Sequence, residues 1–267
     1  MVHVSPYLIE RHISRSPLLR RAWELLTSDT EVQSLLRMAN VNAVERLLYN
    51  DHGPVHAQIV AGTALELFDM LYRHGLRPSS IIHKTVPTLD CARLIVLLGA
   101  YLHDIGNSVH RDNHELIGAI LSGPILDRLL PNIVSLCREQ CDQYKVRSEV
   151  QQAIYATSMS VTALTLEASI VKVADSLDMA EGRARLPYSK GKMDIHALSA
   201  LSIKRVEITN GESRPVQIRV QMEDKAGMFQ IEKVLLPKIK TSIIQEYIEI
   251  VPILLDDNSI SLSTIYP

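Results

Sequence analysis

The chain has 267 residues, of which 46% are hydrophobic and 22% charged, and its net charge is −2. These values are typical of a globular protein with one large or two ordinary domains, and they exclude a disordered chain. A net charge this small gives the whole chain no electrostatic reason to bind nucleic acid or anionic lipid.

Features at the N-terminus and the cysteines bear on the cellular compartment. The N-terminal stretch lacks the sustained apolar core of a signal peptide, and no run reaches the roughly 18 apolar residues that span a bilayer. Cys91, Cys137 and Cys141 are too few and too irregularly spaced for a disulfide framework. Cys137 and Cys141 could seat a metal, but no second pair of Cys or His follows, so packing among helices is their expected role. We therefore expect a cytoplasmic protein with no membrane partner.

Helical periodicity runs from about residue 16 to residue 180. Ser28 and Glu31 have the spacing of a capping box at a helix start. Residues 55–72 carry an amphipathic stripe, which predicts a helix with one buried face. Residues 91–103 are apolar nearly all round, which predicts a helix at the centre of the domain.

The signals after this central helix are weaker. Gly106 is a plausible helix stop, and either Asp112 or Asn113 can cap the helix that follows. Later helices are expected at about residues 135–144, 148–156 and 164–178.

After residue 190 the hydrophobic pattern alternates instead. Two alternating runs, around Val206 and Val220, flank Asn210 and Gly211, which predicts a β-hairpin. A short helix interrupted near Pro237 and a strand over residues 248–251 are expected to follow. We therefore predict a mostly α chain: a helical domain over residues 1–188, then a small α+β domain over residues 189–267.

Polar residues interrupt three of the apolar helices, and seven of the ten histidines fall between residues 52 and 114. His103 and Asp104 end the central helix, His56 lies near the start of the amphipathic one, and Asp175 lies within another apolar stretch. A buried Asp is costly unless a charge neutralises it, and a divalent cation does so directly. Two His and two Asp suit manganese, iron, nickel, cobalt or magnesium better than a thiophilic metal. The alternative, four separately satisfied core residues, is disfavoured because two buried Asp need compensating charge.

The segments GPVHAQIV, YLHDIGN and IVKVADSLD contain, in this order, a His, a His-Asp pair and a distant Asp. The order resembles the HD superfamily of metal-dependent phosphohydrolases, over about residues 45–185 and not over the C-terminal part. The resemblance implies an HD-domain helical bundle whose substrates are phosphoesters, often nucleotides or cyclic nucleotides. It also implies four metal ligands: His56, His103, Asp104 and Asp175.

The number of metals and the general base are less determined. His114 resembles the His that binds a second metal in two-metal members, but residues 153–162 lack the later paired His of those members. We therefore expect one tight metal site, with any second site weak. Asn107 stands where some single-metal nucleotidases carry a Glu that orients water, and an Asn cannot act as a base at neutral pH. Metal ligation, phosphate binding, proton transfer and helix capping are all open for His110 and His114.

The remaining candidates are assigned by their chemistry. Basic side chains can bind phosphate oxygens, although solvated surface charges are the alternative for each. Asp178 could orient His103 or Lys172, with a surface salt bridge as the alternative. The candidate catalytic residues are Asp104, His110, Arg111 and His114. The candidate substrate-binding residues are His52, Asn107, Lys172 and Arg183.

These residues predict hydrolysis of a phosphomonoester or phosphodiester, with a nucleotide as the expected substrate, by attack of a metal-bound hydroxide. The alternative is a non-catalytic nucleotide sensor or regulatory protein that uses the same pocket; Asn107 and the missing paired His favour it. Nucleic-acid binding through residues 200–245 is disfavoured because basic and acidic residues alternate there. The C-terminal domain is expected to form a homodimer interface or to shape the pocket, since its strands must bury one face.

Overall fold

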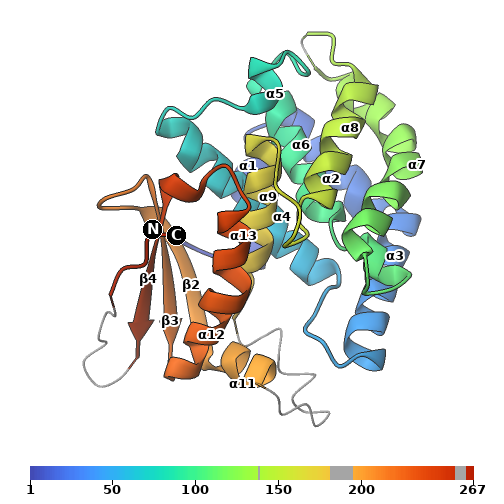
Figure 1. The fold of residues 1–267 in the computed structure, drawn as a ribbon. Helices are drawn as coiled ribbons and strands as arrows, with labels where there is room; N and C mark the ends of the chain where they lie inside the picture. The colour runs from blue at the N-terminus through green and yellow to red at the C-terminus, as the bar shows by residue number, and fades with distance from the viewer. Residues whose placement is uncertain (138, 181–194, 256–262) are drawn as a thin grey trace.

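A computed structural model describes residues 1–137, 139–180, 195–255 and 263–267. The chain forms a helical bundle beside a small mixed sheet (Figure 1), which confirms the predicted fold class. The helices are α1 (Glu10–Ile13), α2 (Pro17–Ser28), α3 (Thr30–Asn40), α4 (Pro54–Arg73), α5 (Ser79–Ile82), α6 (Leu89–Leu102), α7 (His114–Val134), α8 (Gln143–Tyr155), α9 (Leu166–Leu177), α11 (Ile195–Ser202), α12 (Met228–Gln230) and α13 (Leu236–Lys240).

Helix α6 is the centre of the bundle, as its uniformly apolar sequence predicts. Residues 94–102 are all buried, and α4, α8 and α9 pack around the helix. Complete burial of each Leu or Ile side chain contributes about 1.5–3 kcal/mol. Thr88 caps the N-terminus of α6 by accepting a hydrogen bond from the Cys91 amide.

The start of α3 differs from the capping box that Ser28 and Glu31 suggest. Asp29 is the N-cap, and its Oδ1 accepts a hydrogen bond from the Val32 amide at 3.0 Å. Ser28 instead ends α2, where its hydroxyl donates to the Glu24 carbonyl at 2.7 Å. Ser and Asp are equally good N-caps, so the neighbouring α2 decides between them.

Helix α7 is longer than its sequence signals suggest. It continues through Pro124 and Pro131 to Val134, and the helix expected from residue 135 begins only at Gln143, with residues 135–137 and 139–142 outside any helix. Among the described helices, α7 is long and apolar enough to cross a membrane, judged by length and composition only. Half of that stretch is buried within the molecule, as in the core helix of a soluble protein, so this evidence is weak.

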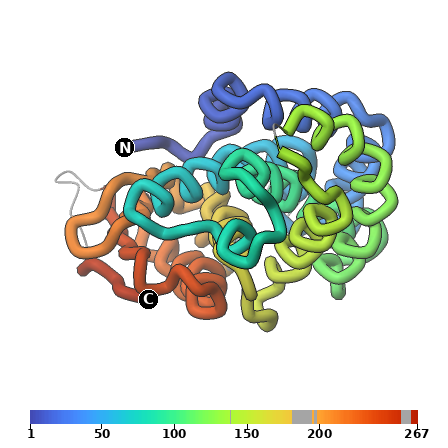
Figure 2. The backbone as a smooth tube through the Cα atoms, turned by 90° about the horizontal axis from the view of Figure 1, so that it is seen from above, coloured from blue at the N-terminus to red at the C-terminus, as the bar shows by residue number. Residues whose placement is uncertain are grey.

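The sheet has the strand order β1-β2-β3-β4. The predicted hairpin is formed by β2 (Ile203–Asn210) and β3 (Val216–Met222), with Ile208 opposite Ile218. The fourth strand, β4 (Ile248–Leu254), runs parallel to β3, and β1 (Val2–His3) pairs antiparallel with β2. The two ends of the chain therefore lie at opposite edges of the sheet, and the view from above separates them (Figure 2).

The crossover from β3 to β4 connects the sheet to the bundle. It contains a π-helix (Ile231–Leu235) followed by α13, and α13 packs against α9 (Figure 1). Pro237 lies in the first turn of α13, directly after the π-helix. The domain boundary predicted near residue 188 falls outside the described residues and stays a prediction.

Candidate metal centre

The four predicted ligands come from the ends of three helices. His56 lies in the first turn of α4, which Pro54 begins. His103 and Asp104 directly follow α6, and Asp175 lies in the last turn of α9. Because these helix ends meet, residues up to 119 positions apart in the sequence (175 − 56) face one point.

The two imidazole Nε2 atoms lie at nearly equal distances from each other and from both carboxylates. His56 Nε2 lies 3.3 Å from His103 Nε2, 3.4 Å from Asp104 Oδ2 and 3.3 Å from Asp175 Oδ1. His103 Nε2 lies 3.4 Å from each of the same two oxygens. All four side chains are largely or completely buried. Two imidazole nitrogens and two carboxylate oxygens around one point form a donor set that fits a divalent cation.

Each imidazole is oriented through its other nitrogen. His56 Nδ1 donates to Asp178 Oδ2 at 2.7 Å, and His103 Nδ1 donates to the Ala100 carbonyl at 2.8 Å. Both bonds leave the Nε2 lone pair directed at the common point, as in most protein-bound metal sites. Asp178 thus orients His56, and neither His103 nor Lys172, the partners that we considered from the sequence.

The site has strong internal electrostatics. Burial alone would lower the pKa of His103, but the carboxylates of Asp104 and Asp175 raise it to about 10. Burial opposes ionisation of both carboxyls, yet their cationic neighbours, chiefly His103 and Lys238, hold their pKa values well below the ordinary range. The carboxylates therefore attract positive charge to this point, which a proton or a metal ion can supply.

Asp104 has two further partners that fix its carboxylate. His52 Nδ1 lies 2.6 Å from Asp104 Oδ2, and Asn107 Nδ2 donates to Asp104 Oδ1 at 2.9 Å. His52 lines the cavity beside the site, whereas Asn107 is buried behind Asp104. Asn107 thus orients Asp104, one of the predicted ligands. It does not contact the cavity, although it was predicted from the sequence to bind substrate.

His114 and Arg111 occupy the wall next to Asp104. His114 Nδ1 donates to the Arg111 carbonyl at 2.8 Å, and its Nε2 lies 3.6 Å from Asp104 Oδ1. The Arg111 guanidinium lies 3.1 Å from His114 Nε2 and stacks over Tyr49, 5.8 Å from the ring centre. Burial and the charge of Arg111 lower the pKa of His114, so its imidazole is neutral at neutral pH.

A cavity of about 380 Å³ adjoins this site and is lined by both parts of the chain. The helical part contributes His52, Arg111 and His114, and the crossover contributes Gln230, Lys233, Val234 and Lys238. The Lys238 ammonium forms an ion pair and hydrogen bond with Asp175 Oδ2. Sequence reasoning did not find Lys238, because no motif signals a pair of residues 63 positions apart.

Besides Asn107, two of the predicted residues, Lys172 and His110, do not line the cavity. Lys172 is buried, and its ammonium donates to the carbonyls of Ser158 and Val161, so its placement does not support the predicted phosphate-binding role. Burial lowers the pKa of this ammonium to about 8. His110 is exposed and caps its own turn by accepting a hydrogen bond from the Asp112 amide, which does not support a catalytic role. Arg183 lies outside the described residues.

Comparison with known proteins finds a matching family and a similar protein. The family described as HD domain matches residues 56–180, a span that contains all four predicted ligands. An uncharacterized protein from Methanocaldococcus jannaschii is 43% identical over 228 residues, which cover 85% of this chain and 86% of that protein. No solved structure matches the chain.

Proposed function

The chain belongs to the HD-domain family, a family of metal-dependent phosphohydrolases, and from this premise we propose that it hydrolyses a phosphomonoester or phosphodiester with the help of one tightly bound divalent metal ion. The expected substrate is a nucleotide. The observation that carries the proposal is the convergence of four donor atoms, in which each imidazole Nε2 lies 3.3–3.4 Å from the other imidazole and from both carboxylates.

His56, His103, Asp104 and Asp175 would hold the metal ion. A divalent cation at this point would polarise the phosphoryl group and lower the pKa of an attacking water molecule. The hydrogen bonds from His52 and Asn107 to Asp104, and from His56 to Asp178, keep the donor atoms in place before any ion arrives. Such preorganisation supports one tight site.

The cavity wall offers groups for the substrate and for proton transfer. Arg111, Lys233 and Lys238 supply cations that can bind phosphoryl oxygens. His114 is neutral and lies beside Asp104, so its Nε2 could accept a proton from water, or bind a second, weaker metal, once the Arg111 guanidinium moves from Nε2 to a phosphoryl oxygen. A cavity of about 380 Å³ is at the small end of the range for ligand sites, which favours a small phosphoester over a polymer.

A hydrolysis screen tests this proposal. We expect the purified chain with added manganese, nickel or cobalt to hydrolyse at least one nucleotide, phosphomonoester or phosphodiester. His103→Ala and Asp104→Ala should lose both metal and turnover, whereas the surface variant Asp127→Asn should keep both. Full activity in either site variant would contradict the assignment. Bound metal without turnover across the screen would instead support the nucleotide-sensor alternative.

A further inference from the structure

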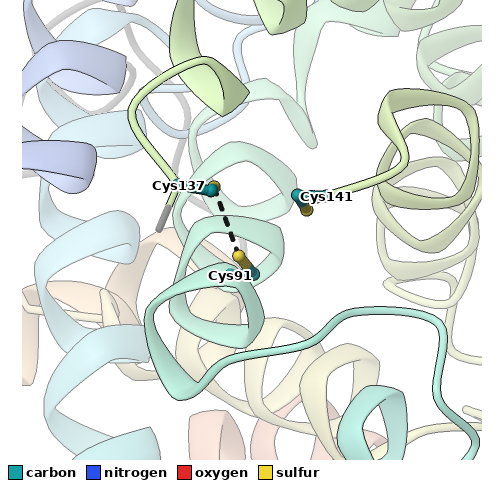
Figure 3. A group of neighbouring side chains, drawn as sticks. All are labelled: Cys91, Cys137 and Cys141. Atoms are coloured by element: carbon teal, nitrogen blue, oxygen red, sulfur yellow. Dashed lines mark hydrogen bonds between the residues drawn. The ribbon is translucent and has the colours of Figure 1, made fainter. Parts of the chain in front are cut away.

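Three cysteines form a second cluster of possible metal ligands, apart from the HD site. Cys91, in α6, lies close to Cys137 and Cys141, which lie between α7 and α8 (Figure 3). The Sγ atoms of Cys91 and Cys137 are 3.4 Å apart, and all three sulfurs lie within 4.8 Å of one another. All three are free thiols, and Cys91 and Cys141 are buried.

Local structure holds each cysteine where it is. Cys91 lies in the first turn of α6, where the Thr88 hydroxyl accepts a hydrogen bond from the Cys91 amide and lies 3.1 Å from its sulfur. Cys137 follows the end of α7, and Cys141 immediately precedes Asp142, the N-cap of α8. Cys137 and Cys141 thus both lie next to the first turn of α6.

The three thiols also change one another's pKa values. Hydrogen bonds from Cys137 and Cys141 lower the pKa of Cys91, whereas the pKa values of Cys137 and Cys141 are raised. One thiolate is therefore stabilised within the cluster, next to the positive end of the α6 dipole.

We propose that Cys91, Cys137 and Cys141 bind one thiophilic metal ion, zinc in the first instance, at a site separate from the HD centre. Tetrahedral zinc with bonds of about 2.3 Å requires sulfurs about 3.8 Å apart. That separation falls between the 3.4 Å of Cys91 and Cys137 and the 4.8 Å within which all three sulfurs lie. Three protein thiolates leave a fourth position for water or another small ligand.

The two metal sites differ in position and in chemistry. Cys91 and His103 lie at opposite ends of α6, and twelve residues at about 1.5 Å each separate them by about 18 Å. Sulfur donors select zinc or monovalent copper, whereas the mixed nitrogen and oxygen site suits manganese or magnesium. A metal at the thiols would fasten the connection between α7 and α8 to α6.

Cobalt spectroscopy on the full-length chain tests this site without reference to activity. The reduced protein should take up cobalt(II) with a near-ultraviolet sulfur-to-cobalt charge-transfer band that saturates by two equivalents, since the HD site also binds cobalt, and zinc should abolish the band. The band should persist in His103→Ala, which lacks a ligand of the HD site. The HD site has only nitrogen and oxygen donors, so it cannot produce a sulfur-to-cobalt band.

Single substitutions then assign the ligands. Cys91→Ser, Cys137→Ser and Cys141→Ser should each strongly reduce the charge-transfer band, with far-ultraviolet circular dichroism as the control for folding. The proposal is overturned if the reduced wild-type chain shows no band with cobalt(II), or if all three variants keep it. It is equally overturned if Cys91 and Cys137 form a disulfide that persists under reductant and blocks metal uptake.

Discussion

Asp178 shows that the metal centre depends on residues that are not ligands. Its carboxylate accepts the Nδ1 hydrogen bond of His56, so Asp178→Asn should weaken the orientation and basicity of that imidazole. We expect manganese affinity to fall about 10- to 100-fold, measured by titration with detection of free Mn²⁺. Asp127→Asn is the matched control, because it makes the same substitution in an ion pair with Arg147 that is much more exposed than the His56–Asp178 pair. Equal affinity in the two variants would show that Asp178 has no positioning role.

His103 predicts the pH dependence of metal binding. Burial opposes its protonation, but Asp104 and Asp175 raise its pKa to about 10, so the metal-free site carries a proton at neutral pH. A metal ion must displace this proton. Affinity for Mn²⁺ should therefore rise about tenfold per pH unit between about pH 6 and 8. An affinity that does not change with pH would mean that His103 is already neutral.

The four predicted ligands could be recognised from sequence because each interrupts an apolar helical run. Their hydrogen-bonding partners could not, because a contact such as His56 to Asp178 depends on the rotation of α4 relative to α9. The long side chain of Lys172 illustrates the same limit. Lys172 is three residues from Asp175, so its ammonium was expected to reach the cavity. In the structure this ammonium donates to two backbone carbonyls instead.

At the scale of elements, Gly106 controls the approach of α7 to the end of α6. A Cβ at Gly106 would lie 1.9 Å from the His114 carbonyl oxygen and 2.6 Å from the Gly118 amide nitrogen. Gly106→Ala should therefore displace the start of α7, where His114 lies. We expect about 1–3 kcal/mol lower stability from overpacking. Turnover should fall about a hundredfold, because a displacement of about 1 Å misaligns the site.

Gly123→Ala within α7 is the matched control. A Cβ there would meet only the Gln151 side-chain amide, at 3.2 Å, so a flexible group can move away. Replacement of a helical glycine should leave stability unchanged or raise it by about 1 kcal/mol. Thermal unfolding and kcat of both variants check the pair, and a Gly106→Ala protein that behaves like Gly123→Ala would refute this role for Gly106.

Hydrophobic periodicity located α4, α6 and α9 well because each has a continuous apolar face. Prediction of the helix ends failed where two neighbouring residues were equally good candidates for a cap or a stop. Ser28 and Asp29 compete for one cap, and Gly106 is not a helix stop, since α6 ends at Leu102 and Gly106 lies in the following 3₁₀ turn. The end of α7 was also missed, because Pro131 does not terminate that helix.

At the scale of the whole molecule, Lys238 connects the C-terminal part to the metal centre. Lys238→Met removes a cation from the cavity wall but none of the predicted ligands. We expect Mn²⁺ binding to persist while kcat/KM falls about 10- to 100-fold, the equivalent of one charged hydrogen bond of about 1.5–3 kcal/mol. Lys240→Met, an exposed residue of the same helix, should have wild-type kinetics. Equal kinetics in the two variants would show that Lys238 does not contribute to catalysis or substrate binding.

The alternating strands were predictable, but their assembly was not. Local pattern identifies the β2–β3 hairpin, because its turn and its strands are adjacent in sequence. The pairing of β1 with β2 and the parallel placement of β4 depend on contacts between distant segments. The same holds for α13, whose packing against α9 favours the prediction that the C-terminal part shapes the pocket.

The central claim is that His56, His103, Asp104 and Asp175 bind one divalent ion. Manganese is the appropriate probe, because it avoids thiolates and so reports on this site and not on the cysteine cluster. The measurement is the number of Mn²⁺ ions bound per chain, in wild type and in Asp175→Ala with its fold verified by circular dichroism. We predict one tightly bound ion in the wild type and none in the variant. No tight binding by the wild type, or equal binding by both proteins, would contradict the account.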